Sequence, residues 1–208
     1  MKTIETERLL LEPLDEDRLE EFVALTADAQ SMRYWRQLGT FSREEAEERF
    51  GRALARTRQR GFGRRWIVLK DTGAGIGFTE TKLLGEGYAE VAPDDVELGW
   101  MLTPSAWGNG YATEAGQAAR DEAFERIGLQ AVIALHHPEN PASGRIMEKL
   151  GMEHERDLVD QTGWPYRLYR LRRERWEQLR ASGATILHPT ASVSPKLVRV
   201  GGDSAPNV

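Results

Sequence analysis

The chain of 208 residues contains no cysteine. This absence excludes disulfide bonds, thiolate nucleophiles and zinc sites built on thiolates. The sequence also lacks a run of about 18 apolar residues, the length that a membrane-spanning helix requires. Its first residues, MKTIETERLLLEPL, lack the apolar segment and small-residue cleavage site of a secretory signal. We therefore expect a cytoplasmic protein that has no membrane partner.

An excess of positive charge is also missing. The formal net charge is −5, so the overall balance does not favour a nucleic-acid partner. The most basic stretch, RTRQRGFGRR at residues 56–65, is of a kind that usually forms a solvated face. Hydrophobic residues make up 40% of the chain and charged residues 29%, the balance of a soluble globular domain.

The hydrophobic pattern of the first half predicts a strand, two helices and a run of three strands. The strand covers Arg8–Leu14 and the helices cover Asp15–Gln30 and Ser42–Arg60. Ser42 and Glu45 form a capping-box pattern, and Gly61 is a stop signal. Short, turn-rich links between the later strands predict an antiparallel meander. These strands are Arg64–Asp71, Gly75–Gly85 and Val96–Thr103.

The second half begins with a helical pattern over Thr113–Gly128 and a continuously apolar strand, Ala131–Leu135. This strand–helix–strand order predicts a right-handed crossover, in which Val96–Thr103 and Ala131–Leu135 run parallel. A helix over Pro141–Leu150 and a hairpin of two strands, EHERDLVD and PYRLYRLRR, follow. We expect residues 1–183 to form one domain. Residues 184–208 form a tail, either flexible or docked as an edge segment through Lys196–Val200.

The stretch WGNGYAT places Gly108 and Gly110 directly before a helix. Unpaired amides at a helix start attract phosphate, and glycine lets the backbone come close to a ligand. Thr113 can add a hydroxyl group or a cap. In isolation, a plain tight turn explains the two glycines more often than phosphate binding does. The chain has neither GxxxxGK[ST] nor an early GxGxxG, which disfavours ATP-loop and dinucleotide-binding proteins.

A second polar stretch, HHPENPASGRIMEKLGM, follows the apolar strand and opens the next helix. Asn140 and Ser143 lie three residues apart at this helix start. Each residue alone is usually a cap, because both side chains can satisfy free backbone amides.

Taken together, VELGWMLTPSAWGNGYATEA and NPASGRIMEKLGM resemble the GNAT superfamily of acyl-CoA-dependent N-acyltransferases. They are similar to the branch that contains the ribosomal-protein N-terminal (alanine/serine) acetyltransferases. The opening ETERLLLEPLDEDRLEEF is similar to that branch's first strand and helix, and the resemblance covers about residues 5–175. It implies an α+β fold. In this fold a mostly antiparallel central sheet contains a splayed parallel strand pair, and helices cover both faces.

The resemblance also implies an acetyl-CoA site. Gly110 and Ala112 match the family's pyrophosphate loop, whereas Trp107 departs from the usual Gln or Arg. The backbone of the splayed strand pairs with pantetheine, an Asn touches pantetheine and a hydroxyl residue lies near the thioester sulfur. The residues expected to bind acetyl-CoA are Met101, Leu102, Trp107, Gly108, Asn109, Gly110, Tyr111, Ala112, Thr113, Asn140 and Ser143.

Acetyl transfer to an amine needs a base, polarisation of the thioester carbonyl and an acid for the thiolate. The resemblance makes Ser143 the candidate acid, and a backbone N–H of the splayed strand can polarise the carbonyl. Glu97 is the candidate base, with an ordinary strand carboxylate as an equal alternative. His136 and His137 are less favoured bases, since loop packing explains them better. The family requires no metal.

The resemblance places the acceptor site between the first two helices and the last two strands. Aromatic candidates for its walls are Trp35, Trp66, Tyr88, Trp100 and Trp164. The acidic net charge mildly favours a basic acceptor, either a protein N-terminus or a small amine. The alternative function is a non-catalytic acyl-CoA-binding regulatory module. Family members are often dimers, so a homodimer is a further expectation.

Overall fold

A computed structural model of the chain describes residues 1–35, 39–84, 91–92, 94–160 and 162–182. Tyr88 and the tail 184–208, including Lys196–Val200, lie outside the described residues. Eight strands form one sheet in the order β1-β2-β3-β4-β5-β6-β8-β7. The strands are β1 Ile4–Glu5, β2 Leu9–Pro13, β3 Arg64–Leu69, β4 Gly75–Leu83, β5 Val96–Leu102, β6 Ala131–His136, β7 Glu153–Val159 and β8 Pro165–Arg172.

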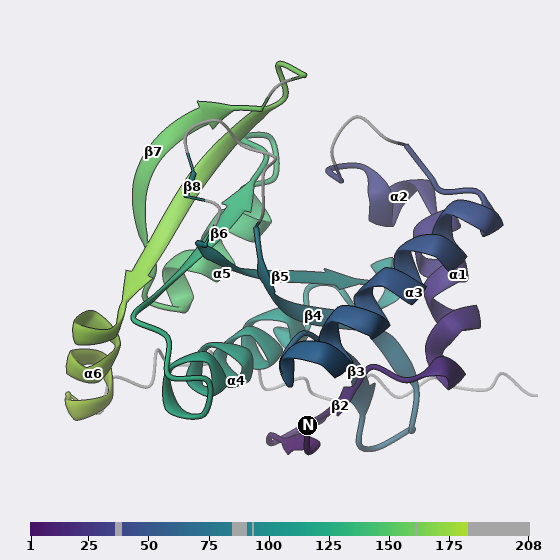
Figure 1. Ribbon diagram of the computed structural model, residues 1–208, viewed down its shortest axis with the longest axis horizontal. Coiled ribbons are helices and arrows are strands. Elements are labelled where there is room, and N and C mark those ends of the chain that lie inside the picture. The colour runs from purple at the N-terminus through teal and green to yellow at the C-terminus, as the bar shows by residue number, and fades with distance from the viewer. Residues whose placement is uncertain (36–38, 85–90, 93, 161, 183–208) are drawn as a thin grey trace, which may run out of the picture.

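Helices lie on both faces of this sheet (Figure 1). They are α1 Leu19–Ala27, α2 Ala29–Met32, α3 Arg43–Arg60, α4 Tyr111–Glu125, α5 Pro141–Lys149 and α6 Arg173–Ala181. Two short 3₁₀ helices, η1 Glu16–Arg18 and η3 Pro104–Ala106, precede α1 and α4 respectively. No helix in the described part of the chain is both long enough and apolar enough to span a membrane.

The predicted antiparallel meander of β3, β4 and β5, the parallel pair β5 and β6 and the hairpin of β7 and β8 are confirmed. Strand β2 also pairs antiparallel with β3. Within the sheet, β8 rather than β7 is the neighbour of β6. The capping box at α3 is also confirmed, because Ser42 and Glu45 accept hydrogen bonds from each other's backbone N–H. Gly61 ends α3 in the left-handed conformation, with φ of 68°.

The prediction of one helix over Asp15–Gln30 is wrong. Asp28 adopts an extended backbone, and its side chain accepts a hydrogen bond from the Ser31 N–H. This cap ends α1 and starts α2, because an Asp side chain at such a position competes with a continuing helix. The first turn, Glu16–Arg18, is a 3₁₀ helix capped by Asp15.

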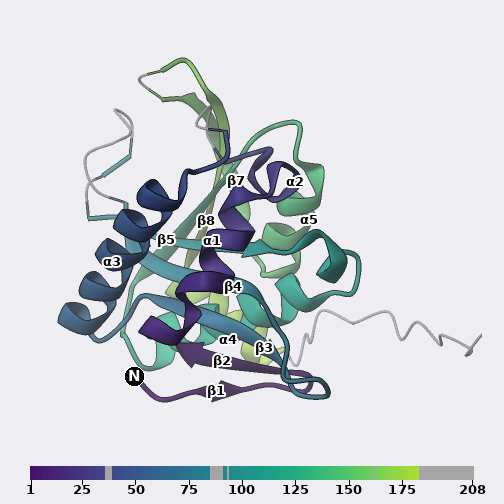
Figure 2. The same ribbon diagram turned by 90° about the vertical axis from the view of Figure 1, so that its right-hand side faces the viewer.

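The two faces of the sheet carry separate hydrophobic clusters, because side chains alternate along each strand. Trp66, Val68 and Phe78 pack with Phe22 and Phe50 under α1 and α3, which lie side by side in Figure 2. On the opposite face Ile67 and Leu102 pack with Ala115 of α4. A third cluster joins β6 and β8 to α4, α5 and α6. These layers hold β5 between two covered faces.

Candidate active site

Strands β5 and β6 separate soon after they meet. They pair at one position, Glu97 with Ile133, whereas β5 pairs with β4 from Val96 to Leu102. A gap therefore opens between the carboxyl ends of the two parallel strands. This is the splayed strand pair that the resemblance implies.

Backbone groups along β5 point alternately to β4 and to this gap. The Thr103 N–H donates to the Ile76 carbonyl on β4 at 2.9 Å, so the backbone of Met101 also faces β4. A Cβ at Gly77 of β4 would lie 2.1 Å from the Met101 carbonyl oxygen, which agrees with this orientation. The backbone groups of Trp100 and Leu102 face the gap. Of the two predicted pantetheine contacts, Leu102 presents its backbone there, while Met101 presents its side chain to the α1–α3 face.

The loop after β5 carries two glycines in the left-handed conformation, Gly108 with φ of 76° and Gly110 with φ of 80°. The side chain of Asn109 donates to the carbonyls of Ala106 and Trp107. Trp107 is 46% exposed, and its indole N–H donates to the Leu102 carbonyl at 2.8 Å. These contacts fix the loop against the end of β5.

Helix α4 starts at Tyr111 without a side-chain cap. Thr113 is buried and does not serve as the predicted cap. The first amides of α4 therefore lack side-chain acceptors at the positive end of the helix dipole, which is the arrangement that attracts phosphate.

Arg8 was not found by sequence reasoning, yet it holds this loop. Its Nη1 donates to the Asn109 carbonyl at 2.9 Å, its Nε donates to Glu114 at 2.7 Å, and its guanidinium lies over the Tyr111 ring. Glu114 is buried and also accepts from Thr6 at 2.6 Å. Burial raises the pKa of Glu114, but hydrogen bonds from Thr6 and Arg8 outweigh it and hold the pKa below its ordinary value. A positive charge thus lies beside the loop where Trp107 supplies none.

Asn140 and Ser143 lie at the start of α5, which follows the end of β6. The Asn140 side chain caps α5 by accepting from the Ser143 N–H at 3.3 Å. The Ser143 side chain is half-buried, and its Oγ makes no hydrogen bond with another described residue. Asn140 and Ser143 follow β6, and the Gly108–Gly110 loop follows β5. Because these strands are parallel, their carboxyl ends lie at the same edge of the sheet, so both groups of residues border the gap.

His136 and His137 both pack against neighbouring residues. His136 is buried against Gly144, where an added Cβ would lie 3.0 Å from Nε2. Burial lowers the pKa of His136, which favours its neutral form. The ring of His137 packs between those of Tyr34 and Trp164, with centroids at 5.9 and 4.5 Å. These contacts agree with the loop-packing interpretation.

Glu97 lies where β5 leaves β6. Its carboxylate is 3.2 Å from the Lys82 ammonium group on β4, and its side chain is 14% exposed. The attraction of Glu97 raises the pKa of Lys82, so the lysine stays charged. The next residues on the same face of β5 are Gly99 and Met101. Met101 lines a pocket of about 190 Å³ under α1 and α3 that also contains Arg64, Glu80 and Lys82.

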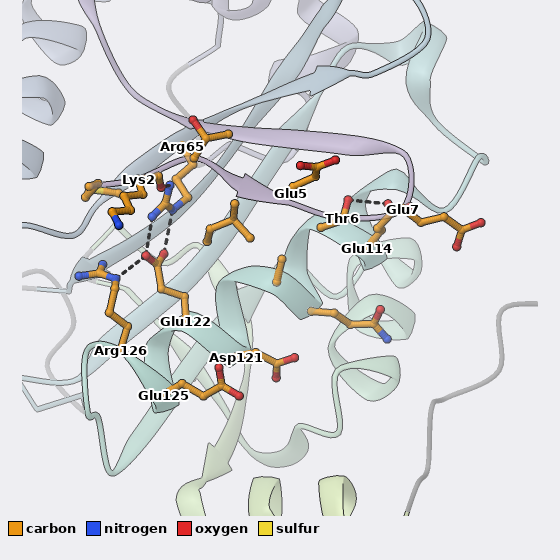
Figure 3. Close-up of a pocket in the computed structure, with 15 residues that line it drawn as sticks. Lys2, Glu5, Thr6, Glu7, Arg65, Glu114, Asp121, Glu122, Glu125 and Arg126 are labelled. Carbon is orange, nitrogen blue, oxygen red and sulfur yellow. Dashed lines mark hydrogen bonds and ion pairs between the residues drawn. The ribbon is translucent and has the colours of Figure 1, made fainter.

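A larger hollow of about 950 Å³ lies between the N-terminal residues and α4 (Figure 3). Glu122 forms ion pairs there with both Arg65 and Arg126. Burial raises the pKa of Glu122, but the two arginines outweigh burial and lower it. None of the predicted catalytic or cofactor residues lines this hollow. In the described ranges, no group of three or more His, Asp or Glu side chains could hold a metal ion.

Comparisons with known proteins agree with this geometry. The acetyltransferase (GNAT) domain family matches residues 8–153. The uncharacterized N-acetyltransferase YnaD of Bacillus subtilis (strain 168) is 30% identical over 154 residues, covering 73% of this chain and 83% of that protein. An acetyltransferase crystal structure from Agrobacterium tumefaciens str. C58 has a TM-score of 0.70 at 28% identity and covers 83% of this chain and 95% of its own.

The fold also matches spermidine N-acetyltransferase from Vibrio cholerae, solved with CoA and spermine. The TM-score is 0.65 at 19% identity, with 83% of this chain and 99% of that chain covered, so this likeness concerns the fold. Fold and site together define an acyl-CoA-dependent transferase. The chain belongs to the GNAT acetyltransferase family and is an acetyltransferase that uses acetyl-CoA as cosubstrate. The predicted fold and enzyme class are confirmed, whereas the ribosomal-protein branch stays a prediction.

Proposed function

We propose that the enzyme acetylates a primary amine by direct attack in a ternary complex. Acetyl-CoA lies in the gap between β5 and β6, and the amine approaches from the α1–α3 face. The observation that carries this proposal is the single paired position of the two strands, Glu97 with Ile133. Beyond it, the backbone N–H groups of Trp100 and Leu102 face the gap, next to the uncapped start of α4.

The diphosphate of acetyl-CoA binds to backbone amides of the Gly108–Gly110 loop and the first turn of α4. Arg8 contributes a guanidinium group beside the loop, where it donates to the Asn109 carbonyl. Pantetheine extends along β5 past Leu102, with Asn140 and Ser143 at the other border of the gap. The remaining predicted cofactor residues, Trp107, Asn109, Tyr111, Ala112 and Thr113, shape the loop and the helix start.

The reaction needs two proton transfers. The amine nitrogen attacks the thioester carbon, and a β5 backbone N–H facing the gap stabilises the oxyanion. Glu97 accepts the proton that the amine loses, while Lys82 orients its carboxylate. The C–S bond then breaks, and the Ser143 hydroxyl donates a proton to the departing thiolate.

The test is an acetylation assay with the full-length protein, acetyl-CoA and a panel of primary amines that includes a peptide N-terminus. Because the chain has no cysteine, a thiol reagent reports CoA release without background from the protein. We expect one acetylated amine for each CoA thiol, with initial-rate lines that intersect as a ternary complex requires. A folded protein that binds acetyl-CoA but acetylates no amine would instead support the regulatory-module alternative.

A further inference from the structure

The pocket under α1 and α3 has a charge opposite to that of the whole chain. Of the described residues that line it, five are cations and one is a carboxylate. The cations are Arg49, Arg52, Arg56, Arg64 and Lys82, and the carboxylate is Glu80. The chain as a whole carries a net charge of −5. Two of these cations pair with carboxylates outside the lining, Arg52 with Glu48 and Lys82 with Glu97. Arg56 and Arg64 share the single carboxylate of Glu80, so the local excess of positive charge lies at these two arginines.

Arg64 is the strongest sign that this pocket suits an anion. It is 5% exposed, and its Nε and Nη1 have no hydrogen-bond partner. Its Nη2 donates to Glu80 at 2.9 Å, and its guanidinium lies 4.0 Å from the Phe78 ring centroid. Buried donors without acceptors are costly, so a ligand that supplies acceptor oxygens would be stabilised here.

Glu80 cannot supply the missing negative charge. Its carboxylate is already within ion-pair distance of both Arg64 and Arg56, at 2.9 and 4.0 Å. Burial raises the pKa of Glu80, but Arg64, Lys82 and Arg56 outweigh burial and lower it to about 2. Glu80 is therefore ionised at neutral pH, and the cations still outnumber it. Lys82 has its own partner in Glu97.

Gly99 lies between residues that line the pocket and the proposed reaction centre. This glycine lies between Glu97 and Met101 on the same face of β5 and directly opposite Glu80 of β4. A Cβ built at Gly99 would meet no atom within 4 Å. Lys82 lines the pocket and lies 3.2 Å from the Glu97 carboxylate, so Glu97 is one ion pair away from the pocket. The pocket's remaining walls are the aromatic rings of Phe22, Trp35, Phe41 and Phe78, together with Thr26 and Met101.

We propose that the acceptor is a small amine that also bears a carboxylate, as an amino acid does. Its carboxylate binds Arg64 and Arg56, and its amine lies at Gly99 beside Glu97. The volume of about 190 Å³ is below the range of about 300–1,000 Å³ common for drug-sized ligands, which favours an acceptor of amino-acid size. A polyamine would bring further positive charge to an already cationic pocket. This inference rests on the proposed amine acetylation and specifies its substrate.

The test compares acetylation rates at saturating acetyl-CoA for matched amines. The panel contains amino acids, their carboxamides, an amine bearing a phosphate and a polyamine. Loss of a charged hydrogen-bonding group typically costs about tenfold or more. We expect kcat/KM for the amino acid to exceed that of its carboxamide by at least that factor. An equal or higher rate with the carboxamide, the phosphate amine or the polyamine would overturn the inference while amine acetylation itself stands.

Variants on α3 provide a second test that spares the buried Arg64. Arg56→Gln removes a cation at the pocket, whereas Arg58→Gln on the same helix breaks an exposed pair with Glu16 outside it. We expect Arg56→Gln to raise KM for the amino acid several-fold with kcat retained, and Arg58→Gln to change neither. Equal behaviour of the two variants would contradict the assignment. If acetyl-CoA binds but no amine is acetylated, the proposed function fails, and this inference fails with it.

Discussion

The two sides of the site use different parts of the polypeptide. On the proposed cofactor side, the groups assigned to acetyl-CoA are backbone amides of β5, of the Gly108–Gly110 loop and of α4. On the proposed acceptor side, side chains from α1, α3, β3, β4 and β5 line the pocket. A backbone site can serve one cofactor in many sequences, whereas a side-chain site changes with each substitution. We therefore expect the identity of the acceptor to depend on residues such as Arg64, Arg56 and Gly99.

The largest expected effect is that of Glu97→Gln, which should change catalysis without changing cofactor binding. This substitution removes the proposed base without changing the shape of the side chain. We expect kcat to fall by about 10²–10⁴ and the Kd for acetyl-CoA to stay within about twofold. Initial rates and calorimetry check the two quantities. Unchanged kcat would show that Glu97 only pairs with Lys82.

Ser143→Ala is the matching test of the proposed acid. The Ser143 Oγ makes no hydrogen bond with another described residue, so its loss leaves no partner unsatisfied there. We expect kcat to fall by roughly 10²-fold, the lower end for a lost proton transfer, with nearly unchanged affinity for CoA. Activity equal to that of the wild type would remove Ser143 from the mechanism.

Gly110→Ala tests the cofactor side through its backbone. Gly110 has φ of 80°, a conformation that costs a residue with a Cβ about 1–2 kcal/mol. Its methyl group would also lie 3.4 Å from Nη2 of Arg8, the side chain that holds the loop. We expect the Kd for acetyl-CoA to rise roughly 10–100-fold.

Gly128→Ala is the control for Gly110→Ala. Gly128 has φ of 82° beyond the other end of α4, and a Cβ there meets nothing within 4 Å. It imposes similar backbone strain far from the loop, so the melting temperature should fall in both variants while acetyl-CoA affinity falls in Gly110→Ala alone. Equal affinities would mean that the loop glycines form a turn without binding phosphate.

Arg8→Gln tests a side chain on the proposed cofactor side, because Arg8 holds the loop whose backbone amides are assigned to the diphosphate. Its loss frees the Asn109 carbonyl and leaves the buried Glu114 with fewer donors. We expect acetyl-CoA affinity to fall roughly tenfold, and more at low ionic strength, as a charge effect requires. Arg18→Gln, which removes the pairs with Glu12 and Glu21, should leave affinity unchanged. A similar loss in both variants would assign the effect to general destabilisation.

The smallest expected effect concerns acid stability on the acceptor side. The pKa of Glu80 is about 2 in the folded protein, below its ordinary value of 4.5. Between these pH values the unfolded chain binds a proton that the folded chain does not, so stability falls as pH falls from about 4.5 to about 2. Urea unfolding should show a shallower pH dependence in Glu80→Gln than in the wild type. A Glu80→Gln slope equal to the wild-type slope would contradict the ion-pair account.

Features coded by neighbouring residues could be predicted from the sequence. The capping box at Ser42, the meander of β3 to β5 and the glycine loop each depend on local patterns and short connections. The two-residue strand β1 and the helix α6 were missed. A strand so short has no periodicity, and Trp176 is the one fully buried side chain of α6 among the described residues.

Features that depend on register or on long-range contacts could not be predicted. The backbone of Met101 faces β4 rather than the gap, because Met101 lies two residues before Thr103, which donates to Ile76 of β4. Which alternate residues of β5 face β4 can be known only once the pairing of the strands is known. Arg8 reaches Asn109 across 101 residues of sequence. The cationic pocket gathers residues from five elements, so neither net charge nor any single motif indicates it.

The most direct test of this account is a calorimetric titration of the full-length protein with acetyl-CoA, using ATP and NAD as controls. If the gap between β5 and β6 and the start of α4 form the cofactor site, acetyl-CoA will bind at one site per chain. ATP and NAD, which lack pantetheine to pair with β5, will bind at least about tenfold more weakly. A folded protein that fails to bind acetyl-CoA, or binds ATP equally well, would contradict the account.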